Sequence, residues 1–314
     1  MTSPSSSRGY YDYPVVKRPV WTWEVPVYFW LGGIGSGAFI VTSLVQRFGS
    51  RDDARQTADG FYLAAAALLP CTPLLIKDLG RPDRFHHMLR VFKPLSPMNL
   101  GAWTLASFTP LAAARAAAQA ADQGRLPVPM RALARLLPRS LTELAGSLLG
   151  LTLAGYTGVL LGATNIPLWA RSKLLGGLFT ASALSSGSAA VSLMAAGRRA
   201  PDATLHRLAT VESGMSAAEL ALLAGFLAQS NAAGKPLTAG RMAAPFWVGA
   251  VGIGTALPLF LRRLGLRASG RRLRFISTLA ALAAIGGSLA LRWTVFEAGK
   301  DSAHDQAASF DLSS

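Results

Sequence analysis

The chain has 314 residues, of which 51% are hydrophobic and only 15% are charged. Soluble domains carry about 25% charged residues, so long apolar runs with this deficit exclude a disordered chain and argue against an ordinary soluble enzyme. The net charge of +15 comes from basic residues that lie between the apolar runs, which argues against nucleic-acid binding. The single cysteine, Cys71, excludes an internal disulfide and any iron–sulfur or zinc site built by this chain alone.

Residues 1–20 are polar, contain three prolines and have no apolar core, so we expect a tail that is neither a signal sequence nor a membrane span. Eight apolar windows follow, at residues 26–45, 60–76, 98–118, 141–163, 172–195, 208–229, 243–261 and 275–292. The second window carries Pro70 and Pro73, which predicts a kink or a break near its end. The sequence therefore predicts an all-α integral membrane protein with eight transmembrane helices.

Two asymmetries predict an orientation. All seven tryptophans fall near span ends on the side of the two termini, as in an interfacial aromatic belt. The expected loop at residues 262–274 holds six basic residues and no acid, which marks the opposite side as cytoplasmic. We therefore expect both termini on the outer, periplasmic side. The five basic residues at 77–93 argue the other way unless a partner covers that loop.

Small residues recur every four positions in the fourth window, at Gly146, Gly150, Ala154, Gly158 and Gly162. Such a stripe lets helix backbones approach closely in lipid, where there is no hydrophobic drive for association. We interpret it as a packing feature.

Two acids lie at the membrane edge on the side of the termini. Glu24 opens the first window and Asp78 closes the second. A carboxylate near hydrocarbon is costly unless it is paired, so each is a candidate for proton exchange. The alternatives are an interfacial anchor for Glu24 and, for Asp78, an ion pair with Arg81 or Arg84 that shapes the loop.

Tyr156 and Arg171 fall at the same membrane face, near the end of the fourth window and in the turn after it. A phenol there can donate a hydrogen bond to a ligand carbonyl, and a guanidinium can bind a partly reduced oxygen. The alternatives are an interfacial tyrosine and a cation that extends to the membrane surface.

Glu212 and Glu219 lie seven residues apart in the sixth window and therefore on one helical face. With Ser213 and Ser216 nearby they suggest a proton path, because acids inside a membrane helix are costly. The alternative is that only Glu219 is buried and Glu212 is interfacial. We expect Glu143, at the start of the fourth window, to be interfacial.

The four histidines are His86, His87, His206 and His304, all in loops, tails or span ends. Haem in a helical bundle needs histidines inside the spans, so a cytochrome-type anchor is not expected. We interpret His86 and His87 as contacts with a partner.

Residues 78–103, with DLGRPDRF followed by PLSPMNLGAW, resemble the signature loop of the NrfD/polysulfide reductase membrane subunits. The segments WEVPVYF, GYTGVLLGATNIPLWARS and residues 292–305 follow the order of the same family. The resemblance extends from about residue 21 to residue 305.

The resemblance implies two four-helix bundles that hold no metal and no haem and that exchange electrons between a quinone, menaquinone or ubiquinone, and a partner. The implied partners are a four-cluster ferredoxin-like iron–sulfur subunit and, beyond it, a molybdopterin catalytic subunit in a bacterial or archaeal cell membrane. In the family the quinone pocket lies in the first bundle. Glu24, Asp78, Tyr156 and Arg171 match polar positions of that region. Asp78 and Glu24 are thus the candidates for proton exchange, and Tyr156 and Arg171, together with Arg81, are the candidates for quinone binding.

The sequence thus divides into a tail at 1–20, a first bundle at 21–165, a second at 166–294 and a tail at 295–314. The family also supports a proton path through Glu212 and Glu219. Two other functions stay open: a proton-coupled secondary transporter, favoured by paired intramembrane acids and a broken span, and a structural anchor without quinone contact.

Overall fold

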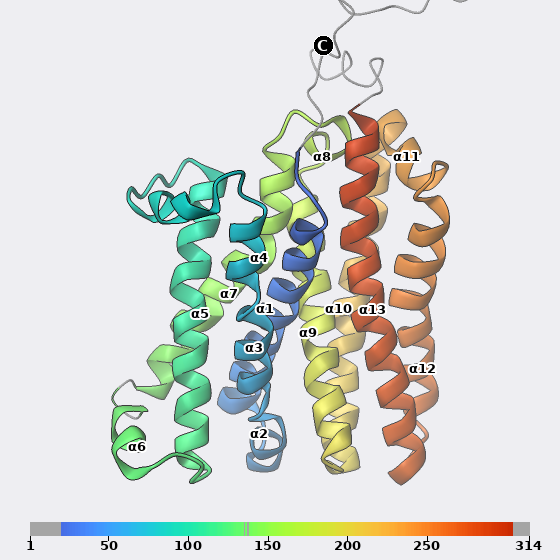
Figure 1. Ribbon diagram of the computed structural model, residues 1–314. Helices are drawn as coiled ribbons and strands as arrows, with labels where there is room; N and C mark the ends of the chain where they lie inside the picture. The colour runs from blue at the N-terminus through green and yellow to red at the C-terminus, as the bar shows by residue number, and fades with distance from the viewer. Residues whose placement is uncertain (1–19, 135, 137, 304–314) are drawn as a thin grey trace, which may run out of the picture.

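A computed structural model describes residues 20–134, 136 and 138–303, and this part of the chain is helical with no strand (Figure 1). Residues 1–19 and 304–314, with His304, lie outside the described residues, whereas residues 295–303 of the expected C-terminal tail are described. The long helices lie side by side along one common direction, and α2 and α6 lie at the end remote from the described chain ends (Figure 1). Residues 20 and 303 meet at the opposite end, which we call the terminal end.

The elements follow the apolar windows of the sequence closely. The first half contains α1 (Glu24–Phe48), α2 (Arg51–Thr57), α3 (Gly60–Leu68), α4 (Cys71–Lys77), the 3₁₀ helix η1 (Pro82–Leu89), α5 (Pro97–Asp122), α6 (Val128–Ala134) and α7 (Arg139–Gly162). The second half contains α8 (Pro167–Ala170), α9 (Leu175–Gly197), α10 (Asp202–Ser230), η2 (Asn231–Gly234), α11 (Lys235–Thr238), the π-helix η3 (Pro245–Ala256), α12 (Leu257–Gly265) and α13 (Gly270–Ser302). The last helix thus continues past residue 294.

Seven helical stretches of the described chain are long and apolar enough to cross a membrane. They are Glu24–Phe48, Arg51–Lys77, Arg139–Gly162, Leu175–Gly197, Asp202–Ser230, Pro245–Gly265 and Gly270–Ser302. The third expected span lies in α5, which is long enough to cross a membrane. Its small and polar residues and Arg115 lower its mean hydropathy. The structure therefore supports seven of the eight expected spans by composition.

The predicted break in the second span is confirmed. Helix α3 ends at Leu68 and α4 begins at Cys71, with Pro70 at the junction. Prolines at 70 and 73 have no N–H to donate, so the helical hydrogen bonding is interrupted there. After the break, α4 ends at Lys77, and Lys77 and Asp78 contact the start of α1 at the terminal end.

Close contacts between backbones hold the helices together. A Cβ atom on Gly37 of α1 would overlap the carbonyl group of Ala183 in α9, and one on Gly158 of α7 would overlap the backbone of α9 at Leu175. Gly146 faces the ring of Phe39 in the same tight way. The interpretation of the glycine stripe as a packing feature is confirmed.

Candidate functional site

A polar cluster joins α1 to the end of α4 at the terminal end. The Nζ atom of Lys77 lies 3.0 Å from Oε1 of Glu24, whose side chain is buried. The backbone N–H of Thr22 donates to Oδ1 of Asp78 at 3.0 Å. The Thr22 hydroxyl lies 2.9 Å from that Asp78 oxygen and also contacts Oε2 of Glu24, so it stands between the two carboxylates. We call Thr22, Glu24, Lys77 and Asp78 the carboxylate cluster.

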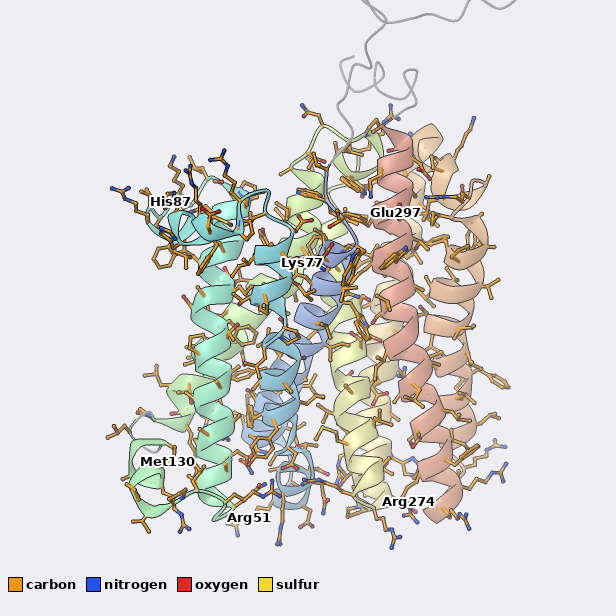
Figure 2. All side chains as sticks on the ribbon, viewed as in Figure 1. Arg51, Lys77, His87, Met130, Arg274 and Glu297 are labelled. Atoms are coloured by element: carbon orange, nitrogen blue, oxygen red, sulfur yellow. The ribbon has the colours of Figure 1, made fainter. Side chains whose placement is uncertain are left out.

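The carboxylate cluster resolves the alternatives for its two acids in part. Glu24 is buried and forms an ion pair with Lys77. Asp78 is half-buried and its described hydrogen bonds go to Thr22, whereas Arg84 pairs with the neighbouring Asp83. Figure 2 shows Lys77 at the upper part of the helices, on the side that faces α1. Exposed Arg81 lies outside the contacts that join the two acids.

Two buried phenols continue inward from the cluster. Tyr28 lies one helical turn below Glu24 on α1, and it faces Tyr156 of α7 and Cys71 of α4. Tyr156 is 7% exposed, and its ring fills the space that a Cβ atom on Gly101 would need. Tyr28 was not identified from the sequence, because a tyrosine in an aromatic stretch is typical of a packed interface.

Two buried donors toward the terminal end of α1 and α5 have no partner in the described part of the chain. Among the described residues, the hydroxyl of Tyr28 and the indole Nε1 of Trp103 are buried and make no hydrogen bond. Buried polar groups in native proteins are almost always paired, so such donors point to a ligand or water. Arg171 is half-buried after α8 and does not belong to the carboxylate cluster.

A small cavity of about 60 Å³ lies beside this region, between α4, η1 and α5. Its lining is apolar and includes Leu75, Phe85 and Ala102. Typical ligand pockets measure about 300–1,000 Å³. A ring-sized ligand would therefore need η1, which has no buried residue, to move.

The two acids of α10 are both buried. Glu212 forms an ion pair with Arg262 of α12, with 2.6 Å between Oε2 and Nη2. Both side chains are less than 5% exposed. The expected loop at residues 262–274 is therefore shorter than predicted, because α12 continues to Gly265 and α13 begins at Gly270, and Arg262 is buried inside α12.

Hydroxyl groups connect this ion pair to the second acid. Nη1 of Arg262 donates to Ser216 Oγ at 3.0 Å, and Ser216 Oγ lies 3.1 Å from Ser185 Oγ. Ser185 in turn interacts with Glu219. The contacts thus rise along α10 from Glu212 to Glu219, about 10 Å at 1.5 Å per residue.

Arg292 of α13 closes the far end of these contacts. It is fully buried, and its Nη1 donates to Ser182 Oγ and to the Ser288 carbonyl, each at 3.0 Å. Ser182 also interacts with Glu219. The sequence signal that could have identified Arg292 is a single cation at the end of the last apolar window, well separated from the basic residues at 271–274. We call this set the buried polar chain: Glu212, Arg262, Ser216, Ser185, Glu219, Ser182 and Arg292.

Atoms in the buried polar chain still lack partners. Within the described residues, Oε1 of Glu212 and the Nε atoms of Arg262 and Arg292 are buried and make no hydrogen bond. A hollow of about 590 Å³ between α10 and α12 reaches Arg262 from the end remote from the termini, and Ser213 also lines it. These atoms are suited to bind water.

A second buried ion pair lies in the first half. Nε of Arg115 in α5 is 2.9 Å from Oε1 of Glu143 in α7, and the guanidinium stacks 3.9 Å from the centre of the Phe61 ring. Arg115 is 2% exposed and Glu143 is 15% exposed. Glu143 is thus a paired residue, which explains how α5 carries an arginine between neighbouring helices.

Metal ligands are not gathered anywhere in the described chain. No group of three or more His, Cys, Asp or Glu residues could hold a metal ion within these residues. Cys71 is buried and free. His86 and His87 lie on η1 at the exposed terminal end, where Figure 2 shows His87 projecting outward.

Known proteins match nearly the whole chain. The family model described as "Polysulphide reductase, NrfD" matches residues 14–301. The C chain of polysulfide reductase from Wolinella succinogenes is 28% identical over 303 residues, covering 90% of this chain and 94% of the relative. Protein NrfD of Escherichia coli is 27% identical over 311 residues, covering 90% and 95%. The chain therefore belongs to the NrfD/polysulphide reductase family and is a multi-pass helical membrane protein.

Proposed function

We propose that this chain is the membrane subunit of an oxidoreductase complex and exchanges electrons between the quinone pool and an iron–sulfur partner. One observation carries the proposal: the carboxylate cluster, the unpaired Tyr28 hydroxyl and the exposed basic segment after α4 lie together at the terminal end. Acids, hydrogen-bond donors and a partner surface are the three parts that such a reaction needs. The name of the Wolinella relative, one chain of a polysulfide reductase, agrees with this role.

The residues present fit a quinone. A bound quinone supplies two-electron chemistry that also takes up two protons. The hydroxyls of Tyr28 and Tyr156 and the indole N–H of Trp103 are buried donors of the kind that quinone oxygens need. The apolar cavity between α4, η1 and α5 would admit a ring once η1 moves. Arg171 and Arg81 remain candidates for binding at the edge of this site.

The carboxylate cluster has the arrangement of a proton exchanger. Glu24 is buried and Asp78 is half-buried, and the Thr22 hydroxyl stands between them. A proton can therefore pass between solvent at Asp78 and the buried Glu24 through one hydroxyl. Lys77 stabilises the charged form of Glu24 at 3.0 Å. In this proposal Asp78 and Glu24 are the acids that supply protons.

The segment after α4 is the proposed docking surface for the iron–sulfur subunit. Charge and apolar groups occur together there: residues 81–95 include four Arg or Lys residues and two histidines. Phe92 is 56% exposed and Leu95 is 98% exposed. An exposed surface of this kind marks a protein interface. An acidic, four-cluster ferredoxin-like subunit that serves a molybdopterin subunit would match this surface.

We also propose that the buried polar chain conducts protons in the second half. Its acids Glu212 and Glu219 are joined by serines and end at two arginines. The hollow at Arg262 gives water access from the end remote from the termini. Buried, linked acids of this kind mark proton relays in membrane proteins.

The membrane arrangement completes the proposal. We propose that α5 is the eighth span, since it lies alongside the other long helices (Figure 1), and that the two halves form four-helix bundles. The terminal end then faces the outside, and the basic residues 263–274 face the cytoplasm of a bacterial or archaeal cell.

The buried polar chain also favours a second function, a proton-coupled transporter. Purification from native membranes through a tag on this chain distinguishes the two. A redox subunit is expected to co-purify with subunits that contain iron–sulfur clusters and molybdenum and with bound quinone. Recovery of the chain alone, without iron or quinone, would contradict the redox proposal and favour transport.

A further inference from the structure

The end of α1 remote from the termini stands between two hollows that the proposed redox function does not use. The first, of about 340 Å³, lies between α1, α2 and α10. It is lined by Val41, Leu44, Val45, Phe48, Gly49, Asp53, Thr57, Thr204, Arg207, Leu208 and Val211. Most of this lining is aliphatic or aromatic, so the hollow is an apolar groove.

The second hollow, of about 350 Å³, lies on the other side of α1, against the start of α7. It is lined by Ser43, Leu44, Arg47, Phe48, Ser140, Glu143, Leu144 and Ser147. Leu44 and Phe48 line both hollows and are 50% and 79% exposed. These two side chains therefore form a ridge with a groove on each side.

Each groove has one exposed arginine. In the first, Arg207 donates to Asp53 at 2.7 Å, yet its side chain is 58% exposed. Asp53 also accepts from Thr204 at 2.7 Å and is buried, so its charge is already compensated and the rest of the guanidinium faces outward. In the second, Arg47 is exposed.

Glu143, the acid that lines the second groove, does not repel a negative ligand, because its charge is compensated. Glu143 is held by Arg115 at 2.9 Å. The two grooves together thus offer two outward-facing cations, Arg47 and Arg207, beside apolar walls one or two turns from the end of α1. That is the depth of the boundary between lipid headgroups and acyl chains.

We propose that the ridge binds one anionic diacyl phospholipid, with one acyl chain in each groove and the phosphate between Arg47 and Arg207. Two grooves on either side of one ridge match two chains that leave one headgroup. Arginine is the side chain best suited to phosphate, and basic pockets between membrane helices bind anionic headgroups. A quinone headgroup matches the first groove poorly, because its aspartate and its Thr204 hydroxyl already bond to each other.

Native mass spectrometry of the purified full-length chain, with the subunits that purify with it, tests the site. The probes are dioleoyl phosphatidylglycerol and dioleoyl phosphatidylcholine. We expect one saturable phosphatidylglycerol per chain and weaker phosphatidylcholine binding. Arg47→Gln, which leaves the Asp53 pair intact, should weaken phosphatidylglycerol binding about fivefold. The matched control, Arg271→Gln, removes an exposed arginine at the same membrane end and should change nothing.

Filling the first groove is the second arm. Val45→Trp and Val211→Trp place an indole in the groove from opposite walls, α1 and α10, so one can fail to fold without ending the test. Either folded variant should lose the bound lipid with both arginines present. Unchanged phosphatidylglycerol binding in a folded filled variant would overturn the site. If Arg271→Gln weakens phosphatidylglycerol binding as much as Arg47→Gln does, the effect comes from the overall charge of this membrane end and the site is overturned. If Val45→Trp displaces bound quinone instead, the occupant of the first groove is quinone and the lipid proposal is overturned.

Discussion

Arg262 and Glu212 form an ion pair of 2.6 Å in which both side chains are less than 5% exposed. The two residues come from α12 and α10, so the pair fixes these helices against each other. Removal of one member of a buried pair leaves an uncompensated charge, which costs about 3–5 kcal/mol. This pair is therefore a sharp test of the interior of the second half.

We expect Arg262→Gln to lower the free energy of unfolding by about 3 kcal/mol or more, seen as a lower unfolding temperature in detergent. The neighbouring Arg263→Gln is the matched control, because Arg263 is exposed on the same helix, and it should change stability little. The double variant with Glu212→Gln should recover part of the loss. If the Arg262→Gln and Arg263→Gln variants unfold at the same temperature, the ion pair does not contribute to stability.

The second prediction concerns Glu219, which faces Ser182 and Ser185 in the buried polar chain. Glu219→Gln keeps the shape of the side chain but cannot carry a proton between them. We expect proton movement in proteoliposomes to fall by about tenfold or more while the protein stays assembled. Asp52→Asn removes an exposed acid on α2, outside the polar chain, and should leave proton movement unchanged. Normal proton movement with Glu219→Gln would remove this residue from the path.

The third prediction concerns Asp78, which accepts both the N–H and the hydroxyl of Thr22. We expect Asp78→Asn to leave assembly intact and to lower quinone-coupled turnover by about 100-fold. Electron transfer from the catalytic subunit to a soluble dye should survive.

Asp52→Asn is the control for that experiment, because Asp52 is an exposed acid on α2, at the end of the molecule remote from Asp78. It should leave both activities unchanged. If Asp78 had only a structural role, Asp78→Asn would instead lower the yield of the complex together with both activities. Full quinone turnover in an assembled Asp78→Asn complex would shift the proton role to Glu24.

The fourth prediction concerns packing at Gly37. An added Cβ atom there would overlap the Ala183 carbonyl, and a backbone group cannot move aside as a flexible side chain can. We expect Gly37→Ala to lower stability by about 1–3 kcal/mol or to reduce the yield of folded protein. Gly197→Ala is the control, since no atom lies within 4 Å of its added Cβ. Equal stability of the two variants would mean that α1 and α9 can separate at no cost.

The fifth prediction concerns topology. A reporter that is active only in the cytoplasm should be inactive when fused after Ser314 and active when inserted after Arg267. Activity at Ser314 would invert the proposed orientation and move the partner subunits to the cytoplasm.

Much of the helical layout could be predicted from the sequence, because apolar windows and prolines are local signals. Pro70 and Pro73 predicted the break between α3 and α4, and the glycine stripe of α7 predicted a close helix contact. The third window was harder, because α5 is less apolar than its neighbours. Its Arg115 is tolerated only because Glu143 lies opposite, and no window average reports such a partner.

Only the acids of the buried polar chain could be predicted from the sequence. Glu212 and Glu219 stood out as acids in an apolar helix, and the structure brings them into one buried set. Their cations did not stand out: Arg262 follows the apolar window and resembles a loop residue, and Arg292 lies near the end of its window. Which cation meets which acid depends on how α10, α12 and α13 pack, and that is information about contacts far apart in the chain.

Helix α1 contacts both halves of the molecule, with Gly37 against α9 and the Trp30 indole donating to the Ile285 carbonyl of α13 at 3.0 Å. The chain is consequently indivisible at the turn near residue 166, although its two halves look like separable modules. In residues 1–165 produced alone, the surface of α1 around Gly37 would lack α9, against which it packs. The Trp30 indole N–H would also lack its acceptor, the Ile285 carbonyl. The carboxylate cluster and the contact with α13 therefore share one helix, since Glu24 and Trp30 both lie on α1.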